Sequence, residues 1–251
     1  MSGHSKWSSI KHKKATIDSR RGQLFTKLAR EIAVAARDGA DPDSNSRLRL
    51  AIQKARENNM PGDNVQRAIQ RGSGGGDVSA LQEVTYEGYG PGGIAILVEA
   101  VTDNRNRTVA DVRAALSRGG GSLAENGAVA WQFELHGVII VATERAAPDD
   151  VQLVAIEAGA AEVSADEDEV EVEVITESGA LEGVRAALVA AGLEVTRAEI
   201  AQLPKNIVGL DERVAIQALR LLDQLDELDD VARVYSNADF PAEALAAVSA
   251  S

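Results

Sequence analysis

The first 78 residues combine a polar start with three stretches of helical periodicity. Residues 2–17 carry too few apolar side chains to pack, which predicts a mobile polar arm. From about Ser19, apolar residues recur every three or four positions, as on the buried face of a helix. The pattern predicts three amphipathic helices, whose apolar residues are Leu24, Leu28 and Ile32, then Leu48, Ala51, Ile52 and Ala55, then Val65, Ala68 and Ile69.

Proline and glycine mark the ends of these helices. Gly39 and Pro42 end the first helix, the second begins near Ser44, and Pro61 precedes the third. Asp63 and Gln66 have the spacing of a capping box, so Asp63 is the expected N-cap. A flexible linker is expected to close the all-helical domain near residue 78, and it contains Gly72, Gly74, Gly75 and Gly76.

Beyond this linker the pattern changes to strands and helices in alternation. Strands are expected at 83–89, 94–102 and 128–135, and a helix at about 108–118 with Thr108 as its N-cap. A βαββαβ set follows, with strand 137–143, helix 148–158, strands 161–165 and 170–176, helix 179–191 and strand 193–202. That order is typical of the ferredoxin-like arrangement. A last helix at about 210–225 and a strand at 231–235 complete the chain.

The number of elements predicts an inserted domain. The segment 83–135 lacks one helix and one strand of a complete unit, and the segment 210–235 supplies one of each. We therefore expect an α+β protein with an N-terminal all-helical domain followed by two ferredoxin-like α/β domains, the third inserted within the second. The expected domains are 1–78, then 79–136 plus 204–251, and the insertion 137–203.

Charge is distributed unevenly between the two parts of the chain. Residues 1–72 hold 15 Lys and Arg against 7 Asp and Glu, a net of +8. The remainder holds 11 against 32, a net of −21, although the whole chain has a net charge of −13. Such asymmetry is typical of a local binding surface on an otherwise acidic protein. The alternative is a solvated basic face without a partner.

The basic arm and the first helix supply most candidates for contact with nucleic acid. Lysines attract phosphates and release counterions, while Trp and His rings stack on unpaired bases. The predicted contacts are His4, Lys6, Trp7, Lys11, His12, Lys13 and Lys14 in the arm, and Arg20, Arg21, Lys27 and Arg30 in the helix. The alternative for Trp7 is that it folds back onto the helical domain, since Trp is often buried.

Two further segments are rich in polar groups. The loop 102–108 adds Arg105 and Arg107 to the candidates, and its side chains either grip phosphate or RNA sugar or join two domains. Residues 53–61 close the second helix, and ordinary helix-stop chemistry explains them as well as a nucleic-acid contact does.

Several classes of function are excluded or disfavoured. The chain has no cysteine, which excludes disulfides, thiolate nucleophiles and cysteine-ligated zinc, and fits a reducing cytoplasm. No apolar run approaches the ~20 residues of a membrane span, and the N-terminus lacks the apolar stretch of a secretory signal. We therefore expect a cytoplasmic protein without a membrane partner.

The remaining motifs do not indicate catalysis or a cofactor. Gly88–Gly93 matches the dinucleotide pattern G-x-G-x-x-G, but a strand follows it, so we expect a hairpin turn. Asp166–Glu169 lacks the spacing of a calcium loop, and His136 is expected to be a linker residue before Gly137. We expect no enzymatic activity, no metal, no cofactor and no small-molecule substrate.

Six motifs resemble the YebC/PmpR family, in the same order along nearly the whole chain. The resemblance implies a helical domain followed by two α/β domains, the third inserted in the second. Family members are labelled probable DNA-binding transcriptional regulators, and some resemble translation factors, including a mitochondrial activator and bacterial proteins that assist ribosomes at proline stretches. The motifs are Gly3-His4-Ser5-Lys6-Trp7, Lys11-His12-Lys13-Lys14, Ala51-Ile52-Gln53-Lys54-Ala55, Tyr86-Glu87-Gly88-Tyr89-Gly90-Pro91-Gly92-Gly93, Thr102-Asp103-Asn104-Arg105-Asn106-Arg107 and Gly127-Ala128-Val129-Ala130-Trp131.

We therefore expect a nucleic-acid-binding regulator of gene expression. Met1 directly precedes the first motif, which leaves no room for a mitochondrial presequence, so a bacterial cytoplasmic member fits best. The family label favours DNA. The residues favour RNA, such as ribosomal RNA on the ribosome, because an arm with Trp7 suits unpaired bases and no base-reading recognition helix is evident. The alternative from another class is an acidic protein–protein adaptor, and the sequence predicts no oligomeric state.

Overall fold

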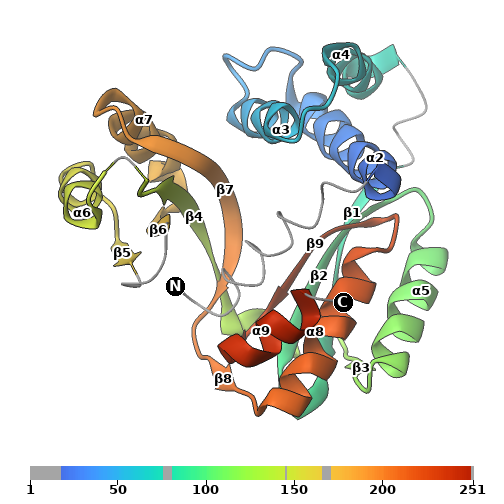
Figure 1. Cartoon of the computed structure of the whole chain (residues 1–251). Coiled ribbons are helices and arrows are strands. Elements are labelled where there is room, and N and C mark those ends of the chain that lie inside the picture. The colour runs from blue at the N-terminus through green and yellow to red at the C-terminus, as the bar shows by residue number, and fades with distance from the viewer. Residues whose placement is uncertain (1–17, 76–80, 145, 166–170, 250–251) are drawn as a thin grey trace. The chain divides into compact units, whose positions relative to one another are not determined.

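The computed structural model describes residues 18–75, 81–144, 146–165 and 171–249 (Figure 1). These residues form an α+β protein, as the sequence predicts, and its two larger sheets are antiparallel. The chain divides into two compact units. One contains Phe133–Lys205, and the other contains the described residues before and after that segment.

Three helices form the N-terminal part of the larger unit. They are α2 (Asp18–Ala35), α3 (Ser46–Glu57) and α4 (Gly62–Gln70), followed by the short helical turn η2 (Arg71–Gly75). A second short turn, η1 (Ala36–Asp38), ends α2. The apolar stripes predicted from the sequence form their common core, which includes Leu28, Ile32, Leu48, Ile52, Val65 and Ile69.

Two local predictions in this region are wrong. The N-cap of α4 is Pro61, so Asp63 lies inside the first turn, where its negative charge interacts favourably with the helix dipole. Gly72 is not a flexible linker residue, because a Cβ atom there would lie 2.1 Å from the Ala33 carbonyl oxygen. Gly72 therefore allows the turn η2 to pack closely against α2.

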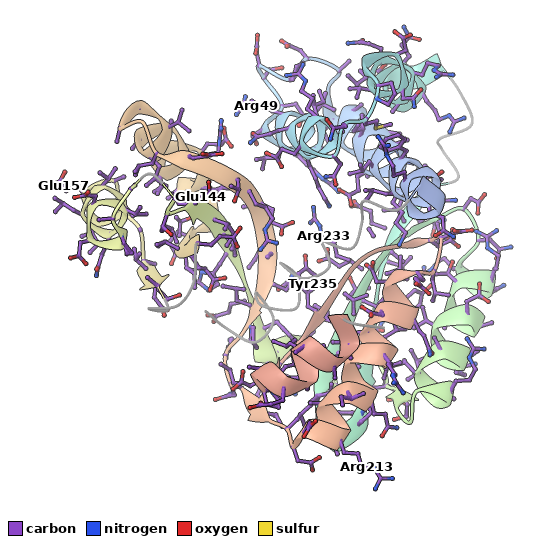
Figure 2. The ribbon with its side chains drawn as sticks, viewed as in Figure 1. Arg49, Glu144, Glu157, Arg213, Arg233 and Tyr235 are labelled. Carbon is purple, nitrogen blue, oxygen red and sulfur yellow. The ribbon has the colours of Figure 1, made fainter. Side chains whose placement is uncertain are left out.

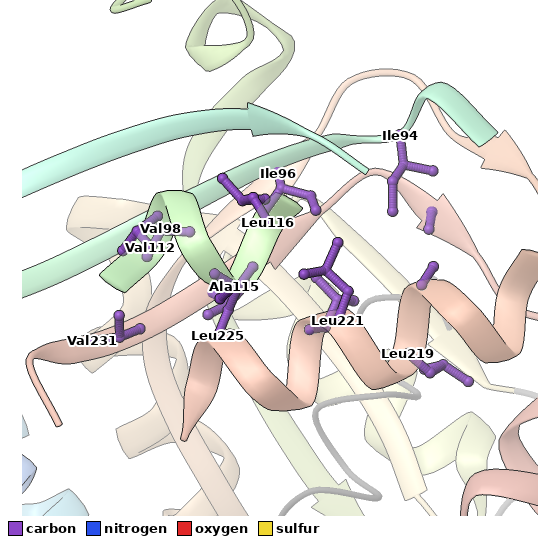
Figure 3. Close-up of a cluster of buried hydrophobic side chains, with 14 of the residues drawn as sticks. Ile94, Ile96, Val98, Val112, Ala115, Leu116, Leu219, Leu221, Leu225 and Val231 are labelled. Carbon is purple, nitrogen blue, oxygen red and sulfur yellow. The ribbon is translucent and has the colours of Figure 1, made fainter. Parts of the chain in front are cut away.

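The α/β part of this unit has one sheet in the order β3-β1-β2-β9. Its strands are β1 (Gln82–Tyr89), β2 (Ala95–Thr102), β3 (Ser122–Leu123) and β9 (Val231–Ser236). Helices α5 (Arg105–Arg118) and α8 (Glu212–Asp226) pack on one face of this sheet. The core between them contains Ile96, Val98, Val112, Leu116, Leu221 and Leu225 (Figure 3). Strand β9 follows the Phe133–Lys205 unit in sequence yet pairs with β2, which precedes it.

Shorter elements complete this part of the chain. The turn η4 (Pro91–Gly93) joins β1 to β2, and η5 (Ala130–Gln132) precedes the second unit. Strands β8 (Val208–Gly209) and β10 (Ala238–Asp239) form a small parallel pair, and α9 (Ala242–Ser249) packs against α8. The periodicity of the sequence did not predict β8, β10 or α9.

The second unit has the predicted sequence of elements. These are β4 (Phe133–Ala142), α6 (Pro148–Glu157), β5 (Glu162–Ala165), β6 (Glu171–Glu177), the turn η6 (Ser178–Ala180), α7 (Leu181–Ala190) and β7 (Glu194–Pro204). The strands are antiparallel neighbours in the order β5-β6-β4-β7. Two helices and four strands in this order form a complete split-βαβ unit.

One strand replaces the two that were expected around residue 136. Strand β4 runs without interruption from Phe133, and residues 130–132 form the turn η5 instead of a strand. His136 is a strand residue and not a linker, and it is paired with Ala201 of β7. A Cβ atom on Gly137 would lie 2.3 Å from Thr176 Oγ1 and 2.9 Å from Leu181 Cβ. The glycine that resembled a break therefore permits close packing within the sheet.

A buried carboxylate, Asp230, lies at the start of β9 and joins four segments of the larger unit. Its Oδ2 atom accepts hydrogen bonds from Thr102 Oγ1 (3.2 Å) and Thr108 Oγ1 (2.7 Å), while Arg107 Nη2 lies 2.7 Å from the same oxygen. Arg30 of α2 donates to Oδ1 at 3.0 Å. Thr108 is thus a buried helix residue, and the N-cap of α5 is Asn104 rather than Thr108.

These contacts keep Asp230 ionised. Burial opposes the charge, but hydrogen bonds from Arg107 and Thr108 and the charges of Arg107 and Arg30 outweigh it. The pKa of Asp230 therefore lies below its ordinary value of 3.8.

Replacing Asp230 with Asn should lower the free energy of unfolding. The variant loses the charge that Arg107 and Arg30 face, which should cost roughly 1.5–3 kcal/mol, toward the lower end because Arg107 is half exposed. A group with a lowered folded pKa stabilises the protein above the unfolded value and loses this effect as the pH falls through the folded value. Wild type should therefore lose more stability than the variant below about pH 4.

Urea denaturation at a series of pH values measures both effects. Asp103→Asn is the matched control, because it removes a more exposed carboxylate that also binds Arg107. If Asp230→Asn and Asp103→Asn have equal stabilities and parallel pH curves, Asp230 does not have the role described.

The register of β4 and β7 predicts how the second unit behaves when isolated. A fragment of residues 133–205 should unfold cooperatively, because it contains the whole four-stranded sheet and both of its helices. A fragment of 137–203 should have a lower melting temperature, since it removes Phe133 to His136, which pair with Pro204 to Ala201. Circular dichroism during heating compares the two fragments, and equal midpoints would show that this end of the ladder adds no stability.

Candidate nucleic-acid interface

The arm that the sequence predicts to bind nucleic acid lies outside the described residues. This applies to His4, Lys6, Trp7, Lys11, His12, Lys13 and Lys14. Arg20 belongs to α2, but its side chain is also outside the described part of the chain. The roles of these eight residues therefore stay predictions.

The other predicted cations of α2 differ in their surroundings. Arg21 is exposed, and its guanidinium carbon lies 5.9 Å from the centre of the Phe25 ring, within cation–π range. Lys27 donates to the backbone carbonyl of Asp226, and Arg30 donates to that of Asp229 at 2.6 Å as well as to Asp230. Lys27 and Arg30 thus join α2 to the end of α8 and to the residues just before β9, and their contact with phosphate stays a prediction.

The two arginines at the start of α5 also have different environments. Asn104 Oδ1 accepts the backbone N–H of Arg107 at 3.1 Å, which starts the helix. The Arg107 side chain bridges Asp103 and Asp230. Arg105 is exposed, and its guanidinium makes no hydrogen bond or ion pair with the described residues. Arg107 therefore joins segments of the protein, whereas contact of Arg105 with a ligand stays a prediction.

Most other cations of α3 and α4 have partners inside the protein. Arg47 pairs with Glu83, Lys54 Nζ lies 3.1 Å from Glu31 Oε1, and Arg49 donates to the Pro42 carbonyl at 2.9 Å. Arg56 and Arg71 are exposed and have no such partner among the described residues. The sequence left the segment 53–61, which contains Arg56, open between helix-stop chemistry and a nucleic-acid contact, and it did not single out Arg71, because charge alone does not show which cations are neutralised.

Two of the family-like motifs meet at a second buried carboxylate, Glu87 of β1. Its oxygens accept the backbone N–H groups of Gly127 (2.6 Å), Val129 (2.6 Å) and Ala130 (2.8 Å). Burial opposes ionisation of Glu87, but these three hydrogen bonds outweigh it and hold its pKa below the ordinary value. Glu87 therefore fixes the loop 127–130 against β1.

This fixed loop positions two exposed aromatic rings. Trp131 Nε1 donates to the Ala128 carbonyl at 3.1 Å, and the Tyr89 hydroxyl donates to the same oxygen at 3.3 Å. Trp131 is 64% exposed and Tyr89 is 39% exposed. Exposed aromatic faces are surfaces on which unpaired bases stack. No feature of the sequence pattern showed that these rings are exposed.

The glycine motif that follows Tyr89 forms the expected turn. Gly92 and Gly93 have φ values of 75° and 78°, and β2 begins directly afterwards. The described residues contain no group of three His, Cys, Asp or Glu side chains placed to hold a metal ion. None of the described helices is long and apolar enough to cross a membrane.

Curated relatives resemble this chain over almost its full length. A probable transcriptional regulatory protein of Roseiflexus castenholzii is 53% identical over 249 residues, which is 97% of each chain. One of Dehalococcoides mccartyi is 54% identical over 244 residues, covering 97% of this chain and 96% of the relative. The crystal structure of a conserved hypothetical protein from Aquifex aeolicus has a TM-score of 0.82 and 41% identity, and covers 90% of this chain and 93% of its own.

Two family descriptions match consecutive parts of the sequence. Residues 5–75 match the TACO1/YebC protein N-terminal domain, and residues 81–238 match the TACO1/YebC second and third domain. Together they include the helical part, the sheet formed by β1, β2 and β9, and the Phe133–Lys205 unit. The chain therefore belongs to the TACO1/YebC family, as its six motifs indicate.

Proposed function

We propose that this protein is a non-enzymatic, nucleic-acid-binding regulator of gene expression whose basic N-terminal third makes the contact. The observation that carries the proposal is the net charge of +8 in residues 1–72 against −21 in the rest of the chain. A polyanion is attracted to the first part and repelled by the second. The name of the relatives, probable transcriptional regulatory protein, supports a regulatory role.

The partners of the described cations refine this interface. Lys27, Arg30 and Arg107 already bind acceptors within the protein. The proposed contacts are therefore mainly those of the arm, together with the exposed side chains of Arg56, Arg71 and Arg105. Phosphate contacts of this kind position a nucleic acid without reading its sequence.

We favour RNA over duplex DNA as the partner. The exposed rings of Trp131 and Tyr89 offer stacking surfaces, and Trp7 would add a third in the arm. Stacking requires unpaired bases, which are frequent in structured RNA and absent from an intact duplex. An RNA-contacting factor that acts on the ribosome is the form of regulation that this chemistry fits best.

Removal of residues 2–17 tests the proposal directly. The truncated protein should keep its melting temperature, because the helical core is made by residues from Leu28 onward. Its affinity for nucleic acid should fall by more than tenfold at moderate salt, since several phosphate contacts are lost. Fluorescence anisotropy with labelled RNA and DNA measures the change, and affinities within about twofold of wild type would overturn the role of the arm.

Replacement of Trp7 with Ala distinguishes RNA from duplex DNA. On single-stranded RNA the variant should lose roughly 1–3 kcal/mol of binding free energy, because one stacked base is lost. On duplex DNA the loss should be slight unless the ring wedges between base pairs. Loss of DNA binding with unchanged RNA binding would overturn the preference for RNA, and equal small losses would show that Trp7 packs on the helical domain.

A further inference from the structure

A cleft of about 550 Å³ lies between the end of α5 and the outer face of α8. Its charged and amide side chains are Arg118, Glu212, Arg213, Gln217, Arg220 and Gln224. Leu116 of α5 and Leu221 of α8 belong to one buried core (Figure 3), and Leu221 also lines the cleft, so the two helices that form the cleft are packed together. The arrangement of the cleft thus belongs to a packed part of the fold.

The polar residues of α8 form a regular stripe. Arg213, Gln217, Arg220 and Gln224 are spaced by four, three and four residues, which places them on one face of the helix. Arg213 and Arg220 are roughly 10 Å apart along the helix axis at 1.5 Å per residue. Arg213 projects from the start of α8 away from the ribbon (Figure 2), and Arg118 comes from the last turn of α5.

The three arginines of the cleft are exposed, and none makes a hydrogen bond or ion pair with the described residues. Other arginines of this acidic part of the chain do, such as Arg107 with Asp230 and Arg185 with Glu182. Among the described residues that line the cleft, Glu212 is the one carboxylate. Three cations without a partner in the described part of the chain therefore gather at one place, in a segment whose net charge is −21.

The amide groups of the cleft add hydrogen-bonding capacity. Gln217 Nε2 donates to the Gly119 carbonyl at 3.0 Å, which holds this side chain across the cleft and links α8 to the end of α5. Guanidinium groups bind phosphate through two parallel hydrogen bonds, and glutamine side chains bind phosphate or sugar oxygens. The side chains that line the cleft therefore suit a ligand in which sugars join several phosphates.

We propose that this cleft binds the phosphates of a nucleic-acid strand, as a second contact distinct from the N-terminal arm. Arg213 and Arg220 are about two helical turns apart on one face of α8, so each can contact a different phosphate along the backbone of a strand. The identity of the ligand rests on the proposed function, but the cleft and its unpaired arginines do not. A free nucleotide offers the same phosphate chemistry, so the experiment includes it as a separate ligand.

The test replaces Arg118, Arg213 and Arg220 together with Gln in the full-length protein. These exposed positions should tolerate Gln, and an unchanged melting temperature verifies the fold. The slope of log affinity for single-stranded RNA against log salt should decrease by about 2, because three phosphate contacts are lost. Glu212→Gln should have the opposite effect and tighten RNA binding, since it removes the negative charge from the cleft.

Matched variants separate the cleft from general charge effects. Arg113→Gln removes an exposed arginine of α5 outside the cleft, and Glu125→Gln removes an exposed carboxylate elsewhere. Each control should change the salt slope by less than the triple variant does per substitution. A triple variant with the wild-type slope, or one whose loss per charge equals that of Arg113→Gln, would overturn the proposal.

Two further measurements identify which proposal fails. If the triple variant loses binding of a nucleoside triphosphate but keeps its affinity for RNA, the cleft holds a free nucleotide and the strand proposal is wrong. If removal of residues 2–17 from the wild-type protein abolishes RNA binding while the triple variant binds normally, the proposed function is supported and the proposed binding site in the cleft is wrong. If the triple variant loses affinity while the truncated protein does not, the binding site in the cleft is supported and the proposed role of the arm is wrong.

Discussion

The buried carboxylate of Asp230 is the interaction on which the arrangement of the larger unit depends. It binds Thr102 of β2, Arg107 and Thr108 of α5, and Arg30 of α2. A buried charge is costly unless all its partners are present, so these segments must assemble together for Asp230 to stay ionised. The polar loop 102–108 is thus explained in large part by a structural role.

The cationic side chains of the protein form two classes, according to whether they bind an acceptor within the protein. Lys27, Arg30 and Arg107 are neutralised by acceptors of the same protein. Arg118, Arg213 and Arg220 have no such acceptor among the described residues, although they belong to a strongly acidic part of the chain. A cation without an internal partner retains its attraction for an external anion, so the second class is where ligand binding is expected.

Periodicity identified the longer helices and strands because their apolar faces are buried in the way that the sequence pattern requires. The sequence-based prediction was wrong where one type of residue can have either of two structural roles. Gly137 resembled a break between strands, but the strand continues and the missing side chain makes room for Thr176 and Leu181. Gly72 resembled a linker, but it permits contact with α2. Thr108 resembled an N-cap, but its hydroxyl binds Asp230.

The sequence by itself determined the α+β class, the order of the main elements and the contrast between a basic N-terminal third and an acidic remainder. These properties depend on local pattern and on composition. Only the tertiary structure decided which cations are paired, where Trp131 and Tyr89 are exposed, and that Arg118 and α8 line one cleft. Several of these contacts join residues about 100 positions or more apart, as between Arg107 and Asp230 or between Gln217 and Gly119, and their approach depends on how the whole chain packs.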